Sequence, residues 1–158
     1  IMVPRRGAQV AQITEKSMSD VLEVRCALDV LAVELACERI TKEEVNELHE
    51  ACKAFEKATA TKDVHVIAKA DVAFHDIIFK AAGNPRLTQM INNLAEQMYR
   101  YRFEYIKDES QHEMLVKEHR QICDSIERRN VEDAKNAIRQ HIENQEKSII
   151  RQIRLEKK

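Results

Sequence analysis

Two side chains that can bind a metal, Asp71 and His75, lie four residues apart in an otherwise apolar segment. On an α-helix, residues four apart project from one face about one turn apart, so both side chains can reach a single ion. Two later histidines, His119 and His141, each continue the apolar face of a predicted helix. A buried aspartate needs a cation or another charged partner, so the four residues predict a divalent-metal site.

A predicted turn at Asn130 relates His119 to His141. His119 lies eleven residues before Asn130 and His141 lies eleven residues after it. At about 1.5 Å per residue, both stand roughly 16 Å from the turn, and antiparallel packing would place them level. Asp71 and His75 occupy the middle of their own predicted helix, so all four residues can meet halfway along a bundle.

The types of ligand residue limit which metal can bind, but they do not decide between a sensor and an enzyme. Three imidazoles with one carboxylate suit Zn, Ni, Fe, Mn or Co, with Zn or Ni favoured, and leave open positions on an octahedral ion. Those positions could serve a sensor of small carboxylates or a metalloenzyme. A metal-free helical interaction domain with histidines in its core is a third alternative. The sequence contains no G-x-S-x-G or phosphate-loop motif, and we expect a binding protein, not an enzyme.

Three further polar residues are candidates for binding a small organic acid. Arg25 and Arg102 interrupt apolar helical patterns, and guanidinium groups offer paired donors to a carboxylate. Asn144, three residues after His141, could add an amide contact. The remaining histidines have polar neighbours and are predicted to lie at the surface: His49, His65 and His112.

The composition predicts an all-α protein. Only 2 Gly and 2 Pro occur among 158 residues, and aromatic residues make up 4%, which leaves little turn chemistry for strands. With 26 basic and 27 acidic residues, the chain has no net field to attract nucleic acid or an anionic membrane. No apolar run is long enough to span a bilayer, and we expect a cytoplasmic protein.

The expected architecture is an antiparallel bundle of about six helices, with residues 1–16 as a linker and 17–158 as the helical domain. In the first helix, the apolar spacing predicts an inward stripe that includes Val24 and Leu31. Thr41, Asp63 and Ser110 are predicted helix caps. The predicted helices span about 17–39, 41–60, 63–82, 85–105, 110–129 and 130–155.

Several segments occur in a specific order along the chain. They are residues 22–38 with Arg25, residues 71–85 from Asp71 through His75 to the Gly-Asn-Pro stop, residues 118–122, and residues 137–141. In this order they resemble the C-terminal effector-binding (FCD) domain of GntR-type transcriptional regulators of the FadR subfamily. The resemblance runs from Met18 to about Gln152. Residues 4–10 resemble the end of the winged helix-turn-helix that precedes this domain in the family.

The resemblance implies a function that composition and spacing leave open. In the family, an Asp and three His hold a divalent ion, and the matching positions are Asp71, His75, His119 and His141. It implies a small carboxylate effector, such as a sugar acid, a lactate-like acid or a fatty acyl derivative, and a homodimer without membrane contact. DNA would be bound only by an N-terminal module that is absent from this chain. One departure is Asp29, where many relatives carry Glu.

Overall fold

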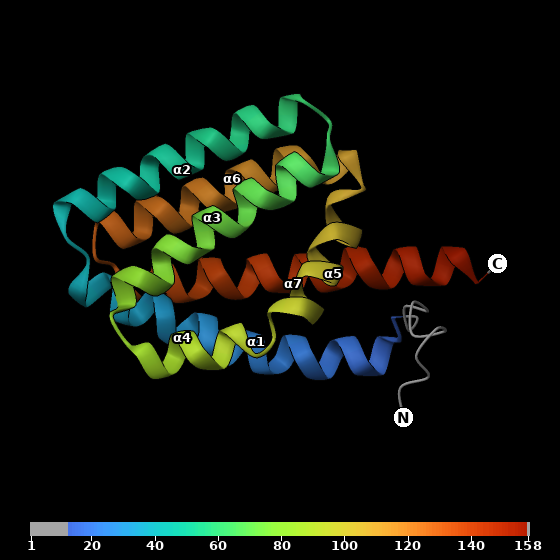
Figure 1. Cartoon of the computed structure of the whole chain (residues 1–158), viewed down its shortest axis with the longest axis horizontal. Helices are drawn as coiled ribbons and strands as arrows, with labels where there is room; N and C mark the ends of the chain where they lie inside the picture. The colour runs from blue at the N-terminus through green and yellow to red at the C-terminus, as the bar shows by residue number, and fades with distance from the viewer. Residues whose placement is uncertain (1–12, 158) are drawn as a thin grey trace, which may run out of the picture.

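The computed structural model describes residues 13–157, which form seven α-helices and one 3-10 helix and contain no strand (Figure 1). The predicted all-α bundle is therefore confirmed. Residues 1–12, which hold most of the predicted linker, lie outside the described residues. The elements are α1 (Glu15–Arg39), α2 (Lys42–Ala60), α3 (Val64–Ala82), α4 (Pro85–Asn92), α5 (Ala95–Ile106), η2 (Glu109–Gln111), α6 (His112–Glu127) and α7 (Val131–Glu156).

Neighbouring helices run mostly antiparallel because short turns join them (Figure 1). The two longest helices, α1 and α7, lie side by side and share the largest contact in the bundle. Helix α2 packs on α3 and α6, while α3 also packs on α1. Helix α3 therefore faces α1, α2 and α5, and its buried side chains lie at the centre of the domain.

Most of the predicted helix ends are confirmed. Thr41 and Glu44 form the reciprocal capping box at the start of α2, and Asp63 caps α3 through the backbone N–H groups of residues 65 and 66. Gly83 ends α3 with φ of 61°, a left-handed conformation that favours glycine. Asn130 caps α7 by accepting the Asp133 N–H.

The predicted continuous helix over 85–105 is wrong, because the chain breaks between α4 and α5. The backbone at Leu94 leaves the helical region, with φ of −101° and ψ of 1°. Asn92 and Asn93 precede this point, and asparagine competes with helical hydrogen bonding through its own side chain. Helix α4 packs on α1, whereas α5 turns across α3 and α7. Tertiary packing of the two halves on different partners therefore overrides one helical pattern.

The predicted cap at Ser110 is also wrong. Asp108 accepts the Ser110 N–H and caps η2, and α6 begins at His112 without a side-chain cap. Because the Asp108 carboxylate accepts the backbone N–H of Ser110, Ser110 lies within η2 and does not cap an α-helix.

The predicted inward stripe of the first helix is wrong in part. Val24 and Leu31 are exposed, while Arg25 and Asp29 on the same helix are buried. Helix α1 carries apolar residues on all sides, so apolar spacing alone does not single out one face. The buried polar pair faces the neighbouring helices instead.

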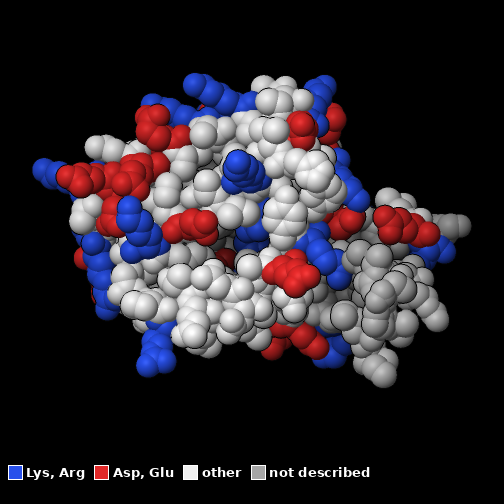
Figure 2. Space-filling model, in the orientation of Figure 1, with Lys and Arg blue, Asp and Glu red and all other residues white. Residues whose placement is uncertain are grey.

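None of the helices between residues 13 and 157 is long and apolar enough to span a membrane. On the face seen in Figure 2, acidic and basic side chains are intermixed over most of the surface. An uncharged area lies over the region of α4 and α1.

Candidate metal centre and adjoining cavity

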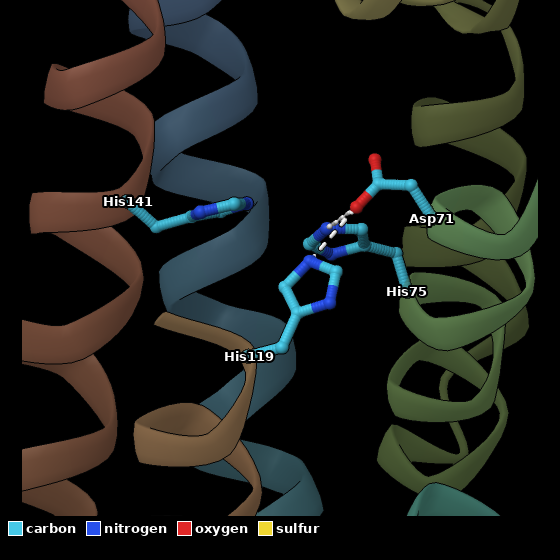
Figure 3. A group of neighbouring side chains, drawn as sticks. All are labelled: Asp71, His75, His119 and His141. Atoms are coloured by element: carbon cyan, nitrogen blue, oxygen red, sulfur yellow. Dashed lines mark ion pairs between the residues drawn. The ribbon is translucent and has the colours of Figure 1, made fainter. Parts of the chain in front are cut away.

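Three helices bring the four predicted ligand residues together in the interior. Asp71 and His75 project from α3 toward His119 of α6 and His141 of α7 (Figure 3). Each residue offers one ligand atom, and these four atoms lie within 4.8 Å of one another. All four side chains are buried, with at most 6% of any residue exposed.

The atoms that face one another in this group have no hydrogen-bond partner. They are Asp71 Oδ1 and the Nε2 atoms of His75, His119 and His141. His119 Nε2 lies 2.8 Å from Asp71 Oδ1 and His75 Nε2 lies 3.4 Å from it, yet neither contact has hydrogen-bond geometry. Buried polar atoms are nearly always paired, so four unpaired ligand atoms that surround one space fit a bound divalent cation.

Hydrogen bonds outside the group orient two of its members. Glu118 Oε1 lies 2.7 Å from His141 Nδ1, which leaves Nε2 to face the centre. Arg102 Nε donates to Asp71 Oδ2 at 2.5 Å, which leaves Oδ1 to face the centre. A carboxylate behind a histidine is a usual support of metal-bound imidazole, because it fixes the tautomer and the ring orientation.

Burial and charge keep the group ready to bind a cation. Burial lowers the pKa of His75 to about 3, although Asp71 opposes this shift. Burial likewise lowers the pKa of His119. For Asp71, burial raises the pKa, but the charges of His75 and Arg102 and the contact with His119 outweigh it, and the pKa falls well below its usual value. Neutral imidazoles and an ionised carboxylate are the forms that bind metals.

A cavity of about 150 Å³ adjoins this group. His75 lines it together with four charged side chains, Arg25, Asp29, Asp76 and Arg102. In Figure 2, basic and acidic atoms are visible in a recess among α3, α4 and α5. The rest of the lining is mainly apolar and includes Val72, Phe79, Ile91 and Met98. A small molecule with a polar and an apolar end would fit this lining.

Comparison with known proteins places the chain in a family. The sequence profile of the FCD domain matches residues 20–144, which is most of the chain. The chain belongs to the FCD domain family. This FCD domain is 25% identical over 139 residues to the uncharacterised HTH-type transcriptional regulator YdhC of Bacillus subtilis, a match that covers 87% of this chain and 62% of that protein. It is also 25% identical over 153 residues to the HTH-type transcriptional repressor RspR of Escherichia coli, covering 97% and 67%.

Solved structures share the fold of this FCD domain. McbR/YncC of Escherichia coli superposes with a TM-score of 0.84 at 17% identity, over 91% of this chain and 73% of that one. A GntR protein of Streptococcus agalactiae superposes with a TM-score of 0.67 at 24% identity, over 88% and 62%. At these identities the likeness concerns the fold alone. The FCD domain thus spans roughly two thirds of the relatives that it matches.

Two of the three predicted acid-binding residues line the cavity. Arg25 is buried and donates from Nε to Asp29 at 3.1 Å and from a terminal nitrogen to Gln145 at 2.7 Å. Arg102 reaches both the cavity and Asp71. Asn144 is not part of this lining, and its Nδ2 instead donates to Glu118 Oε2 at 2.5 Å.

The sequence reasoning gave no supporting role at the site to two acids, Asp29 and Glu118, that the structure shows to be buried there. Asp29 follows Arg25 by one helical turn, and this spacing of opposite charges was the available signal. Glu118 directly precedes His119, but its own role concerns His141 on the next helix. Among the histidines predicted at the surface, His112 is instead buried, and its Nε2 lies 2.7 Å from the Ile106 carbonyl oxygen. This contact lies at the C-terminal end of α5.

Proposed function

We propose that this FCD domain senses a small organic acid at a buried divalent-metal site, as part of a GntR-type transcriptional regulator of the FadR subfamily. The observation that carries the proposal is the set of four unpaired ligand atoms beside a cavity lined by two arginines.

The metal would be held by Asp71, His75, His119 and His141. Three imidazole nitrogens and one carboxylate favour zinc or nickel among divalent ions. When bound, the ion supplies positive charge and open coordination positions for an oxygen ligand. Of the four residues, His75 lines the cavity, so the open positions would face that side.

The charges of the cavity make acid binding depend on the metal. Arg25 and Arg102 are balanced by Asp29 and Asp76 in the same lining. Arg102 is also paired with Asp71 at 2.5 Å. The side chains alone therefore offer an anion little net attraction, and we expect the cation to provide it.

The names of the relatives support a role in gene regulation. RspR is named a transcriptional repressor and YdhC a transcriptional regulator of the helix-turn-helix type. By analogy, we propose that DNA is bound by a module outside this chain, that the protein acts as a cytoplasmic homodimer, and that the acid shifts the population between two arrangements of that dimer. Regulators among the relatives also argue against the metalloenzyme alternative.

The test combines metal analysis with acid binding. Untagged protein purified without chelator should contain stoichiometric metal, and His119→Ala with His141→Ala should lose it. His65→Ala is the matched control, because His65 is an exposed histidine of α3. In isothermal titration with 3-methylbutanoate, lactate and gluconate, at least one of the acids should bind the zinc-loaded wild type, and none should bind after chelation. Equal metal content in the double variant and the wild type would refute the site.

A further inference from the structure

Asp29 is a buried carboxylate with one oxygen that has no partner. The residue is 3% exposed and lines the cavity next to His75. Its Oδ2 accepts a hydrogen bond from Arg25 Nε at 3.1 Å, whereas Oδ1 has no hydrogen-bond partner. Leaving a buried acceptor unpaired is unfavourable, so a ligand that supplies a donor would gain from meeting it.

The neighbours of Asp29 fix where this oxygen points. Arg25 is itself held by Gln145 of α7, which accepts from a terminal guanidinium nitrogen at 2.7 Å. These two bonds use two of the five N–H donors of Arg25 and hold the guanidinium against Asp29 Oδ2. Oδ1 is thereby left as the unpaired acceptor of a residue that lines the cavity.

The ionised form of Asp29 accepts hydrogen bonds and donates none. Burial raises the pKa of Asp29, but the guanidinium of Arg25 opposes this shift and a cation held beside His141 would further favour the ionised form. A ligand group next to Oδ1 must therefore be a donor, such as a hydroxyl or an ammonium. A carbonyl or a second carboxylate in that place would meet an acceptor and be disfavoured.

The apolar part of the lining limits the rest of the ligand. Val72, Phe79, Ile91 and Met98 line the same cavity of about 150 Å³. This space suits a short hydrocarbon substituent and offers few partners to a polyhydroxylated chain.

We propose that Asp29 determines specificity by accepting a hydrogen bond from a hydroxyl or ammonium group of the effector, which is a short carboxylic acid with an apolar substituent. The inference rests on the proposed function, because the carboxylate of that acid would bind at the metal side of the cavity. It adds which second group the acid carries and which residue recognises it.

The test uses three acids with one carbon skeleton: 2-hydroxy-3-methylbutanoate, valine and 2-oxo-3-methylbutanoate. Their affinities for the zinc-loaded chain are measured by isothermal titration. For the wild type, at least one of the two donor-bearing acids should bind tenfold or more tightly than the oxo acid, since a hydrogen bond to a charged group is worth about one order of magnitude in affinity. This comparison is decisive even if a variant fails to fold.

The variant Asp29→Asn replaces the unpaired acceptor Oδ1 with a hydrogen-bond donor. Its amide oxygen would still accept from Arg25, so its NH2 group would face the cavity as a donor. The affinity of the oxo acid should then rise relative to that of valine, so the ratio of the two affinities should shift toward the oxo acid. Asp20→Asn removes a charge from an exposed position of the same helix, outside the cavity lining, and should keep the wild-type ratio of the two affinities.

Each other outcome counts against the proposal. If the wild type binds the oxo acid as tightly as both donor-bearing acids, solvent satisfies Asp29 Oδ1 and the inference fails while acid sensing stands. If Asp29→Asn keeps the wild-type ratio of oxo-acid to valine affinity, Asp29 does not contact the ligand and the inference fails. If none of the three acids binds, and the acids of the wider test also fail, both the inference and the proposed function are overturned.

Discussion

Replacing His119 with phenylalanine should stabilise the metal-free protein and abolish its response to metal. The imidazole of His119 is fully buried between two aromatic rings, with ring centroids 4.2 Å from both Phe55 and Phe74, and it is nearly parallel to Phe74. Neither of its nitrogens has a partner with hydrogen-bond geometry, although Nε2 lies 2.8 Å from Asp71 Oδ1. An apolar ring of similar shape suits these surroundings better than an unpaired imidazole.

The magnitude follows from two opposing effects on the free energy of unfolding. Two unpaired buried nitrogens destabilise the metal-free wild type by about 2 kcal/mol at the lower end of the usual range. The larger phenyl ring costs about 1 kcal/mol through tighter packing. The net gain of about 1 kcal/mol corresponds to a rise of about 2–4 °C in the melting temperature for a chain of this size.

Metal should reverse this order of stability. At a free zinc concentration of about 100 times Kd, binding stabilises the wild type by roughly 2.7 kcal/mol, or about 5–11 °C. His119→Phe lacks a ligand and should show no such rise. Thermal unfolding followed by circular dichroism, with chelator and with zinc, measures both effects. His65→Phe, at an exposed position of α3, serves as the control.

The reasoning would be refuted by a His119→Phe variant that melts below the wild type in chelator. That result would mean that the nitrogens of His119 are satisfied without metal, for example by water. A zinc response of wild-type size in the variant would likewise remove His119 from the ligand set.

Three further predictions concern the supports of the site and of the fold. Glu118→Gln should weaken zinc binding about 10- to 100-fold in a competition titration, because Glu118 orients His141, whereas the exposed Glu113→Gln should leave it unchanged. In chelator, His75 should lower the free energy of unfolding by about 2 kcal/mol between pH 7 and pH 5. The reason is that His75 takes up a proton near pH 6.5 in the unfolded chain, whereas in the folded chain its pKa is about 3. Equal free energies of unfolding in urea at the two pH values would contradict this prediction. Gly83→Ala should lower stability by about 1 kcal/mol in urea unfolding, because φ is 61° there and the added Cβ meets only ordinary contacts, and an unchanged midpoint would show that the turn relaxes.

The clustering of Asp71, His75, His119 and His141 was predictable because it depends on local periodicity and one hairpin. The spacing of Asp71 and His75 fixes their shared face, and the equal distances of His119 and His141 from the Asn130 turn fix their level. Both relations survive any small error in helix boundaries. The caps at Thr41 and Asp63 were predictable for the same reason, since each depends on a few adjacent residues.

The cavity was not predictable because it depends on long-range packing. Its wall includes residues from both sides of the break at Leu94, and the apolar pattern continues across that break without a signal. Arg25 and Asp29 are buried on a helix whose apolar residues occur all round it, so periodicity did not show which face is inward. Only the packing of α1 against α7 and α3 decides that.

The antiparallel pair of α1 and α7 has a mechanical consequence. Beyond His141, α7 continues for fifteen residues to Glu156, a length of roughly 22 Å. Near its far end, Arg154 is joined to Glu15 at the start of α1 by a 2.8 Å ion pair. A tilt of about 5° about His141 would displace that end by about 2 Å, given the rise per residue of a helix. A small change in the tilt of α7 at His141 would therefore produce a larger displacement beside the start of α1 (Figure 1).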